Sequence, residues 1–415
     1  TIRLIEKGKD IYAEITVKGL LESDIVVGNA LVDLYATCGL LEEAQDVFDG
    51  LPMWDAISWT TLIAGYTKHG YGEEALFCFD HMKKEGFTPD VLTYLCTLKA
   101  CGSMGATEKG EKIHEEIVAH GLIEKDLIVA NAVIDMYTSF GFVQKAQEVF
   151  NQLPVQNAVS WTSLIAGYVE NGYDDEALDC FQKMQIEGLT PDAVTLVCCL
   201  KACGNIGAIE IGKLIHHEIL NKGMLGKDSL LGSALVGMYA KCDSLLEALE
   251  VFHELPVRNV VSWNVAIVAF LNHGRFEEAL NCLEQMELEF ISPNVVTYIC
   301  CLKACGNIGA IEKGREVHSK IVKKGFERDN SAWKDLEKLD FDGRGNIFGE
   351  ICGILIQGTV NLSLANALID MYGKCGSMED SQKVFDEMSM RDLMTWTGLV
   401  TGYSRQGEYS IVFYL

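Results

Sequence analysis

The sequence predicts an all-α protein, a right-handed α-solenoid built from stacked helical hairpins. A stretch of 35 residues at 56–90 returns with few changes at 158–192 and 260–294, and a further copy begins at residue 393. The tryptophans at one place in these copies follow one another at an interval of 102 residues: Trp59, Trp161 and Trp263. Repeats on this scale are typical of solenoids, in which each unit contacts mainly its neighbours.

The unit at 56–90 is predicted to be a hairpin of two helices. Leu62 and Tyr66 follow Trp59 at helical spacing, and Gly70 stands where a helix can end in a left-handed cap. A second helix follows, with acidic residues in its first turn and lysines in its last, as the helix dipole prefers. The final aspartate of the unit can cap the next helix. One hairpin cannot bury its apolar faces alone, so neighbouring hairpins must stack.

Three kinds of unit alternate along the chain, and one of each makes a cycle. The short units are 25–55, 127–157 and 229–259; the standard units are 56–90, 158–192 and 260–294; the long units are 91–126, 193–228 and 295–330. Residues 1–24 form part of a long unit. A fourth cycle is predicted to start with a short unit at 362–392 and a truncated standard unit at 393–415.

Residues 331–361 break this order and lack the features of any unit. The segment is rich in glycine, which disfavours helix. Deleting it brings Leu362 into register as the start of the next short unit. Two interpretations stay open: an artefact of the gene model, such as an unspliced segment, or a genuine loop inserted at a repeat junction. In either case we expect the segment to be poorly ordered.

Composition and motifs favour a binding protein over an enzyme. The chain contains no run of 18 apolar residues, so no membrane span is predicted. Because it starts and ends inside repeats, it is interpreted as a fragment. Most of the 15 cysteines recur in register, and none has C-x-x-C spacing, so structural free thiols in a reducing compartment are expected. His114 and Glu116 form half of a zinc-deaminase motif, but a structural helix position is favoured. We therefore expect no catalytic residue, cofactor or metal.

The units closely resemble the pentatricopeptide repeat family, specifically its plant subclass with alternating short, standard and long repeats. The stretches that carry the resemblance are NALVDLYATCGLLEEAQDVFDGLP, SWTTLIAGYTKHGYGEEALFCFDHMKKEGFTPD and TLKACGSMGATEKGEKIHEEI. The tetratricopeptide pattern fits only partly, because Ile63 stands where that pattern has glycine. The resemblance implies a solenoid in a mitochondrion or chloroplast that reads single-stranded RNA one base per repeat.

That subclass mostly specifies sites of C-to-U RNA editing, which is the process the resemblance implies. A deaminase would then lie beyond Leu415 or act in trans, alongside other proteins of an editing complex. Two alternatives are a protein-binding scaffold of tetratricopeptide type, which the acidic charge suits, and a decayed or wrongly assembled gene, which the 331–361 segment suits.

In this family, a polar residue early in the first helix and the last residue of the repeat read the base together. Transferred to matching positions, the pairs and their expected bases are Asn29/Asp55 for U, Thr60/Asp90 and Thr162/Asp192 for G, Asn131/Asn157 for a pyrimidine, mainly C, Ser233/Asn259 for A, Asn264/Asn294 for a pyrimidine and Asn366/Asp392 for U. Thr397 suggests a purine, with its partner beyond the chain end. The implied target is 5′-U-G-n-Y-G-n-A-Y-n-U-R.

Apolar side chains near each reading position are expected to pack on the base: Val26, Ile57, Ile128, Val159, Leu230 and Val261. Ser363 departs from this pattern, so its repeat is expected to bind weakly. The long units place Leu95, Val197 and Ile299 at the reading position, where they cannot hydrogen-bond and should act as permissive spacers. A structural alternative is that the asparagines only satisfy backbone groups between hairpins. Against it, the position varies among Asn, Thr and Ser while the surrounding helix barely changes.

The chain has a formal net charge of −25, whereas a nucleic-acid binder is expected to carry an excess of positive charge. Many acids cluster in the second helices, including Glu73, Glu74, Asp174, Asp175 and Glu176. Lysines recur instead in or near the ends of the first helices: Lys68, Lys99, Lys201, Lys241, Lys303 and Lys374. Some of these lysines are expected to line the groove and contact phosphates.

Overall fold

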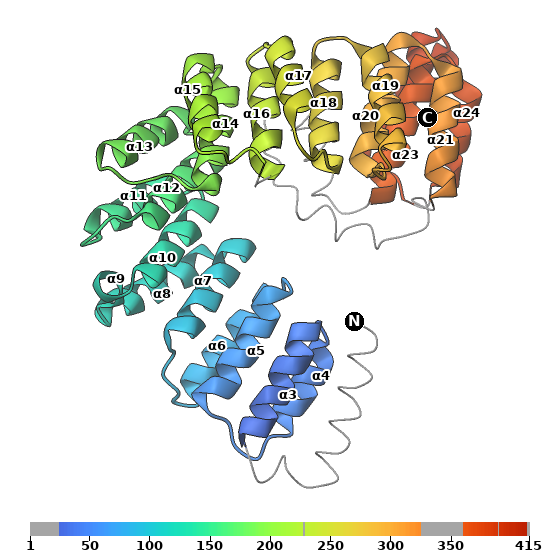
Figure 1. Cartoon of the computed structure of the whole chain (residues 1–415). Helices are drawn as coiled ribbons and strands as arrows, with labels where there is room; N and C mark the ends of the chain where they lie inside the picture. The colour runs from blue at the N-terminus through green and yellow to red at the C-terminus, as the bar shows by residue number, and fades with distance from the viewer. Residues whose placement is uncertain (1–24, 227–228, 325–359, 389, 413–415) are drawn as a thin grey trace. The chain divides into compact units, whose positions relative to one another are not determined.

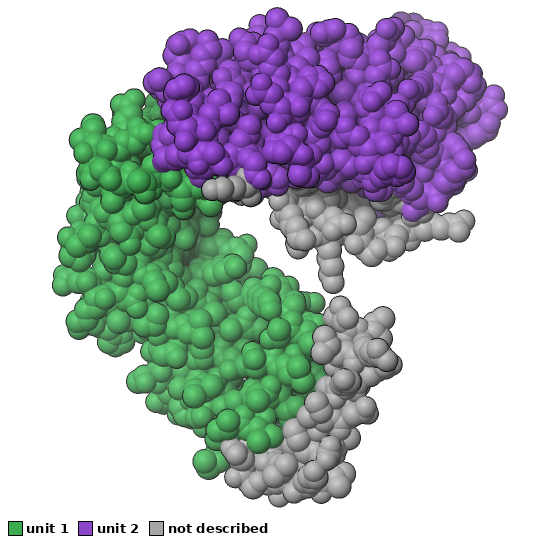
Figure 2. All heavy atoms as spheres, in the orientation of Figure 1, with its two compact units in different colours: residues 1–195 green, residues 196–415 purple. Residues whose placement is uncertain are grey.

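The computed structural model describes residues 25–226, 229–324, 360–388 and 390–412. Every regular element in these residues is a helix, and together they confirm the prediction of an all-α array of helical hairpins. The predicted part-repeat 1–24 and nearly all of the 331–361 segment lie outside the described residues. None of the described helices is long and apolar enough to span a bilayer. The chain divides into two compact units, residues 1–195 and 196–415 (Figure 2), and the division falls within α14 (Ala193–Ile206).

In the first unit, the helices come in pairs along the chain (Figure 1): α3 (Ile25–Cys38) and α4 (Leu41–Asp49), α5 (Ala56–Lys68) and α6 (Gly72–Lys84), α7 (Val91–Met104) and α8 (Thr107–Ala119), the short α9 (Leu122–Lys125), α10 (Leu127–Ser139) and α11 (Val143–Gln152), α12 (Ala158–Glu170) and α13 (Asp174–Ile186). Each first helix packs on its own partner and on the next first helix, in the order α3, α5, α7, α10, α12. The first helices therefore form one continuous layer within this unit.

The second unit repeats this arrangement: α15 (Ile209–Asn221), α16 (Ser229–Lys241) and α17 (Leu245–Glu254), α18 (Val260–Asn272) and α19 (Phe276–Leu288), α20 (Val295–Ile308) and α21 (Ile311–Lys323), α23 (Val360–Lys374) and α24 (Met378–Glu387), α25 (Leu393–Arg405) and the short α26 (Tyr409–Val412). Its first helices pack in the order α16, α18, α20, α23, α25.

The helices begin and end at residues whose chemistry favours a boundary. The Asp90 carboxylate accepts a hydrogen bond from the Thr93 backbone N–H at 2.7 Å, while the Thr93 hydroxyl faces the Asp90 backbone, so the predicted cap is a reciprocal capping box. Five further first helices start with the same box: α5, α12, α18, α20 and α25. Gly70 adopts a left-handed φ of 81°, as predicted, where α5 gives way to α6.

The repeating tryptophan packs on a phenylalanine of the preceding second helix. Trp161 lies edge-on to Phe150 with 4.6 Å between ring centroids, and it is 4% exposed. The same contact recurs for Trp59 on Phe48, Trp263 on Phe252 and Trp396 on Phe385. Edge-to-face aromatic pairs at this distance are favourable beyond the area that they bury. These pairs tie each short unit to the standard unit that follows it.

The contacts across residues 325–359 have the same register as elsewhere in the array. His114 meets the Tyr137 hydroxyl at 2.8 Å, and His216 meets Tyr239 at 3.0 Å, each pair 23 residues apart. His318 makes this contact with Tyr372 at 2.9 Å although 54 residues separate them, a spacing longer by the length of the 331–361 segment. Helix α20 also packs on α23 as α7 packs on α10. The helices on either side of the segment therefore stack as consecutive repeats.

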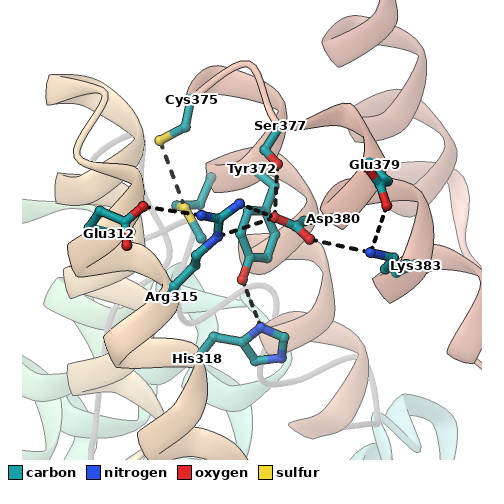
Figure 3. A network of polar contacts seen from close by, with 10 residues as sticks. Glu312, Arg315, His318, Tyr372, Cys375, Ser377, Glu379, Asp380 and Lys383 are labelled. Atoms are coloured by element: carbon teal, nitrogen blue, oxygen red, sulfur yellow. Dashed lines mark hydrogen bonds and ion pairs between the residues drawn. The ribbon is translucent and has the colours of Figure 1, made fainter.

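Ion pairs strengthen this junction (Figure 3). The Arg315 guanidinium of α21 donates to the Asp380 carboxylate of α24 at 2.8 Å, and Asp380 also accepts from the Ser377 hydroxyl at 2.8 Å. These hydrogen bonds hold the pKa of Asp380 below its usual value. Arg315 reaches Glu312 on its own helix as well. The network joins two second helices directly, α21 and α24.

A tyrosine–glutamine hydrogen bond links the paired units in three cycles. The Tyr66, Tyr168 and Tyr403 hydroxyls donate to Gln45, Gln147 and Gln382 at 2.9, 2.8 and 3.0 Å. In the third cycle both partners are apolar, Leu249 and Phe270. The two members of the pair therefore change together within one chain.

We expect Gln147→Leu to destabilise the α11–α12 region by about 1 kcal/mol, because the Tyr168 hydroxyl loses its acceptor. Adding Tyr168→Phe should recover most of that loss, since the double variant copies the third cycle. Native-state hydrogen exchange of α11 and α12 measures both effects. Losses that simply add in the double variant would show that the hydrogen bond does not couple the two positions.

Candidate nucleic-acid interface

A line of exposed apolar side chains marks the second position of the first helices. Side-chain exposure there is between 54% and 69% for Val26, Ile57, Ile128, Val159 and Leu230, and Val261 is half-buried. These are the six residues predicted to pack on bases. Three more residues at the same offset from a helix cap are exposed and were missed by the sequence interpretation: Leu92, Val194 and Met394. Their distance from the capping residue was the signal that could have found them.

The predicted reading residue lies three positions further along each helix, so it shares a face with the exposed apolar side chain. In three repeats the structure joins it directly to the predicted partner. The side-chain amide nitrogen of Asn29 lies 3.2 Å from the Asp55 carboxylate, Asn264 lies 3.1 Å from Asn294, and Asn366 lies 3.3 Å from Asp392. The partner is the capping residue of the next first helix, so capping and pairing use the same side chain.

In two more repeats a threonine bridges the pair. The hydroxyls of Thr60 and Thr93 lie 2.7 Å apart, and Thr93 donates to the Asp90 carboxylate at 2.7 Å. Thr162 is joined to Asp192 through Thr195 in the same way. A backbone carbonyl of the same helix lies 2.8 Å from each of the Thr60 and Thr162 hydroxyls and competes with the bridging threonine for the hydroxyl proton. A hydroxyl has one proton, so Thr60 and Thr162 can offer a ligand only their remaining acceptor capacity.

Three predicted reading residues are not joined to a partner. No hydrogen bond links Asn131 to Asn157 or Ser233 to Asn259; Asn157 and Asn259 cap α12 and α18, and the Ser233 hydroxyl donates to Ser229 of its own helix. Thr397 is exposed and donates to Leu393. The geometry thus brings together five of the seven complete pairs.

Several asparagines keep an unused acceptor. The side-chain oxygens of Asn29, Asn131 and Asn366 are buried and have no hydrogen-bond partner. A buried polar atom without a partner costs about 1–3 kcal/mol, so such atoms are uncommon in a folded protein. Asn264, by contrast, is 1% exposed, and its oxygen accepts from the Thr297 hydroxyl at 2.7 Å. Three short units therefore keep an unpaired amide oxygen, closed to solvent in this structure, that Asn264 lacks.

The aspartates at the caps are held in their charged form. Burial pushes the pKa of Asp55 upward, but hydrogen bonds from the Ser58 backbone and hydroxyl and from the Asn29 amide outweigh it and leave that pKa below its usual value. Asp392 shows the same balance, with Thr395 and Asn366 as donors. Both carboxylates are then acceptors only, and in each the same oxygen accepts from the cap and from the asparagine amide.

The predicted phosphate-contacting lysines differ in availability. Lys374 pairs with Asp370 at 2.6 Å, and Lys241 donates to Asn205 at 2.7 Å, so both are already engaged. Lys68 and Lys99 are exposed and form no hydrogen bond or ion pair with described residues. Lys201 and Lys303 are half-buried. Lys68 and Lys99 are therefore the better candidates for contacts with phosphate.

Many charged side chains of the second helices form ion pairs with a neighbouring second helix. Ion pairs join Lys83 to Glu116, Lys109 to Asp80, Lys145 to Glu111, Lys313 to Glu284 and Lys320 to Glu287, each between neighbouring second helices. These lysines are consequently not free to bind phosphate, and the acidic excess remains on that layer.

The residues of the H-x-E motif serve different neighbours. His114 of α8 bonds to Tyr137 of α10, whereas Glu116 pairs with Lys83 of α6. Burial lowers the pKa of His114 and of His216. Across the described residues, no three His, Cys, Asp or Glu side chains lie close enough to hold a metal ion. These contacts give both histidines a structural role.

Most of the cysteines that recur in register are buried in the helix layers. Every cysteine in the described residues is a free thiol. Burial raises the pKa of Cys282 to about 12 and that of Cys180 to about 11, so these thiols stay protonated and unreactive at neutral pH. They act as small core side chains.

The fold and its repeated interface define a helical-hairpin repeat protein. The chain belongs to the pentatricopeptide repeat family: a model of the PPR repeat family matches residues 55–103, 156–205 and 258–307, and a model of the PPR repeat matches 29–53, 128–156, 233–260 and 364–393. This confirms the family resemblance on which the residue assignments were based.

Relatives of known sequence support this family assignment, and a solved structure shares the fold. A chloroplastic pentatricopeptide repeat-containing protein of Arabidopsis thaliana is 33% identical over 402 residues, which is 97% of this chain and 59% of the relative. A mitochondrial one from the same plant is 30% identical over 404 residues, covering 97% and 54%. The chain thus spans about half the length of the curated relatives it matches. The crystal structure of the maize pentatricopeptide repeat protein PPR10 shares the fold, with a TM-score of 0.52 at 19% identity over 94% of this chain and 63% of that one.

Proposed function

We propose that this chain binds single-stranded RNA in a sequence-specific manner within a plant organelle, through the first helices of its repeats. One observation carries the proposal: an exposed apolar side chain and a polar pair recur together at a fixed offset from the helix caps. The apolar residue offers a surface for the flat face of a base. The polar pair offers donors and acceptors for its edge. A repeated arrangement of this kind suits one base per repeat.

The base assignments follow the polar pairs. Asn29 with Asp55, and Asn366 with Asp392, form hydrogen-bonded pairs in which the asparagine oxygen has no partner, and both pairs are assigned to U. Thr60 and Thr162 with their aspartates, bridged by threonine, are assigned to G. The remaining pairs keep their assignments, with the weakest expected contribution from Asn264, because it is enclosed and fully hydrogen-bonded. The proposed target remains 5′-U-G-n-Y-G-n-A-Y-n-U-R, with the 5′ end at the N-terminal repeat.

The acidic charge predicts modest affinity. Phosphate neutralisation supplies much of the affinity of most nucleic-acid binders, and this chain carries a formal net charge of −25. Lys68 and Lys99 would supply the local attraction. Base packing and base-edge contacts should therefore account for a larger share of binding here than in basic proteins.

We further propose that the chain belongs to the plant subclass with alternating short, standard and long repeats, and that its output is the choice of sites for C-to-U editing or a related processing step. A deaminase would act in trans or lie outside residues 1–415. The relatives named above are chloroplastic and mitochondrial, which supports an organellar location. The maize protein PPR10 has also been solved with an 18-nt psaJ RNA element, which is a property of that protein.

A competition binding experiment tests the proposal. One RNA carries UGnYGnAYnUR, and a second replaces G by A at the bases assigned to Thr60/Asp90 and Thr162/Asp192. Each mismatch should cost on the order of 1 kcal/mol, by analogy with base mismatches in protein–DNA sites, so the second RNA should bind about thirtyfold more weakly. An RNA changed only at the bases opposite Leu95 and Val197 serves as the control and should bind as well as the first. Equal or absent binding of all three RNAs would remove the assigned code.

A further inference from the structure

An aromatic pocket lies in the first cycle, away from the predicted RNA-binding residues. It has a volume of about 390 Å³ and is lined by residues of α4, α5, α6 and the α4–α5 loop. Its aromatic residues are Phe48, Trp54, Trp59, Tyr66, Phe77 and His81. None of the predicted base-reading or base-packing residues lines it. The pocket is therefore available while RNA occupies the first helices.

The rings form a partly open cage. Trp54 stacks on Phe48 with 5.5 Å between centroids and an angle of 7°, and Trp59 lies edge-on to both rings. Phe77 is 64% exposed and packs against His81 at 4.3 Å. Two carboxylates, Asp49 and Glu74, complete the lining. Burial, together with the negative charge of these two carboxylates, raises the pKa of Cys78, which also lines the pocket, to about 12.

In two other cycles an arginine side chain packs on the rings equivalent to Phe48 and Trp59, which are called the floor below. In the third cycle Arg258 takes the position of Trp54, and its guanidinium lies 5.5 Å from the Phe252 ring and 5.8 Å from Trp263. In the fourth cycle, Arg391 lies 4.5 Å over Phe385. The phenylalanine–tryptophan floor of this fold therefore binds a guanidinium when the chain supplies one, as aromatic faces generally do.

In the first cycle the Trp54 indole takes the place of this cation, 5.5 Å from the Phe48 ring and 5.6 Å from the Trp59 ring, so the pocket has aromatic rings and acids but no cation of its own. Glu278, the third-cycle counterpart of Glu74, is held by Arg275, whereas Tyr71 stands at that position in the first cycle. Neither Asp49 nor Glu74 forms an ion pair with a described residue. The second cycle lacks the cage, because Gln156, Asp179 and Lys183 replace Trp54, Phe77 and His81.

We infer that this pocket is a docking site for an arginine side chain from a basic segment of a protein partner. The half-buried Trp54 ring and the exposed Phe77 ring would take the guanidinium plane, and Asp49 and Glu74 would neutralise its charge. A planar guanidinium suits stacking and carboxylate pairing together, which a lysine ammonium does less well. RNA is disfavoured as the occupant, because two uncompensated carboxylates would repel its phosphates. The site would let the chain hold a partner protein and RNA at the same time.

Fluorine NMR of the 415-residue chain labelled with 5-fluorotryptophan tests the inference. The probe is the peptide acetyl-Gly-Gly-Arg-Gly-Gly-amide, and the matched controls carry citrulline or lysine in place of arginine. The arginine peptide should shift the Trp54 and Trp59 signals in a saturable manner and leave Trp161 unmoved. Citrulline should cause no shift, and lysine should bind several-fold more weakly. Equal shifts with citrulline or with lysine would overturn the inference, as would shifts of Trp54 and Trp59 by single-stranded RNA instead of the arginine peptide.

Two exposed substitutions give a second test. Phe77→Asn and Asp49→Asn introduce the residues found at these positions in other cycles, Asn281 and Asn151, so the fold should tolerate both. Together they should weaken the peptide roughly tenfold, while affinity for the UGnYGnAYnUR RNA stays unchanged. Unchanged peptide binding in the double variant would contradict the site. Because the RNA readout is separate, failure of the docking site and failure of the proposed RNA function are distinguishable.

Discussion

Replacing Trp161 with alanine should destabilise the α11–α12 junction by about 3–5 kcal/mol. The indole is 4% exposed, packs edge-on to Phe150 at 4.6 Å, and donates to the Glu187 carboxylate at 3.0 Å. Its removal would leave a cavity between two hairpins and remove the packing partner of the Phe150 ring. Since each hairpin is stabilised mainly by its neighbours, the loss should spread to α13 as local opening before the rest of the array unfolds.

Native-state hydrogen exchange, resolved by helix, measures this effect better than a single melting temperature, because repeat arrays need not unfold in two states. Trp396→Ala is the matched control. Trp396 makes the same contact with Phe385, at 4.7 Å, but is 38% exposed. Its replacement should cost clearly less than that of Trp161. Equal costs would show that burial between hairpins is not what the repeated tryptophan supplies.

Gly167→Ala should destabilise the α10–α12 contact by about 1–3 kcal/mol. A Cβ atom at Gly167 would overlap the Thr138 side chain, lying 2.6 Å from its Cβ atom, and the two first helices would have to move apart. Thr138 cannot easily turn away, because its hydroxyl donates to the Asp135 carbonyl at 2.9 Å and the side chain is buried. The close approach of first helices thus depends on a missing side chain.

The third cycle provides the expected rescue. There, alanine stands at both positions, as Ala269 and Ala240, and both residues are buried. Adding Thr138→Ala to Gly167→Ala should therefore recover most of the lost stability, measured by chemical denaturation and by exchange protection of α10 and α12. A double variant no more stable than Gly167→Ala alone would contradict the steric explanation.

The helix pairs could be predicted from sequence because three nearly identical cycles show the same periodicity, glycines and caps. Asp90 was expected to cap α7 and does so, and Gly70 takes the left-handed conformation expected of it. The register after the 331–361 segment also follows from sequence spacing, and the His318–Tyr372 contact agrees with it. Helix caps and periodicity depend on residues close together in the sequence, and in a repeat protein the same local pattern occurs several times.

Contacts between repeats were harder to predict, since sequence spacing alone does not reveal which side chains meet. The hydrogen-bond chain from Thr60 through Thr93 to Asp90 joins α5 to the start of α7, with the whole of α6 between them in sequence. Lys374 looked available for phosphate, yet it pairs with Asp370 on its own helix. The unused oxygens of Asn29 and Asn131 could not be predicted either, because burial and the absence of a partner depend on packing.

If the polar pair of each repeat selects a base, exchanging one pair for another type should change the preferred base. Thr60→Asn turns the Thr60/Asp90 pair into the Asn/Asp type that the chain already uses at Asn29/Asp55. The measurement is the affinity of both proteins for the UGnYGnAYnUR RNA and for the same RNA with U at the base assigned to Thr60. The unchanged chain should prefer G by about tenfold, and the variant should prefer U by a similar factor. A variant that keeps the preference for G, or that binds both RNAs equally, would contradict the claim.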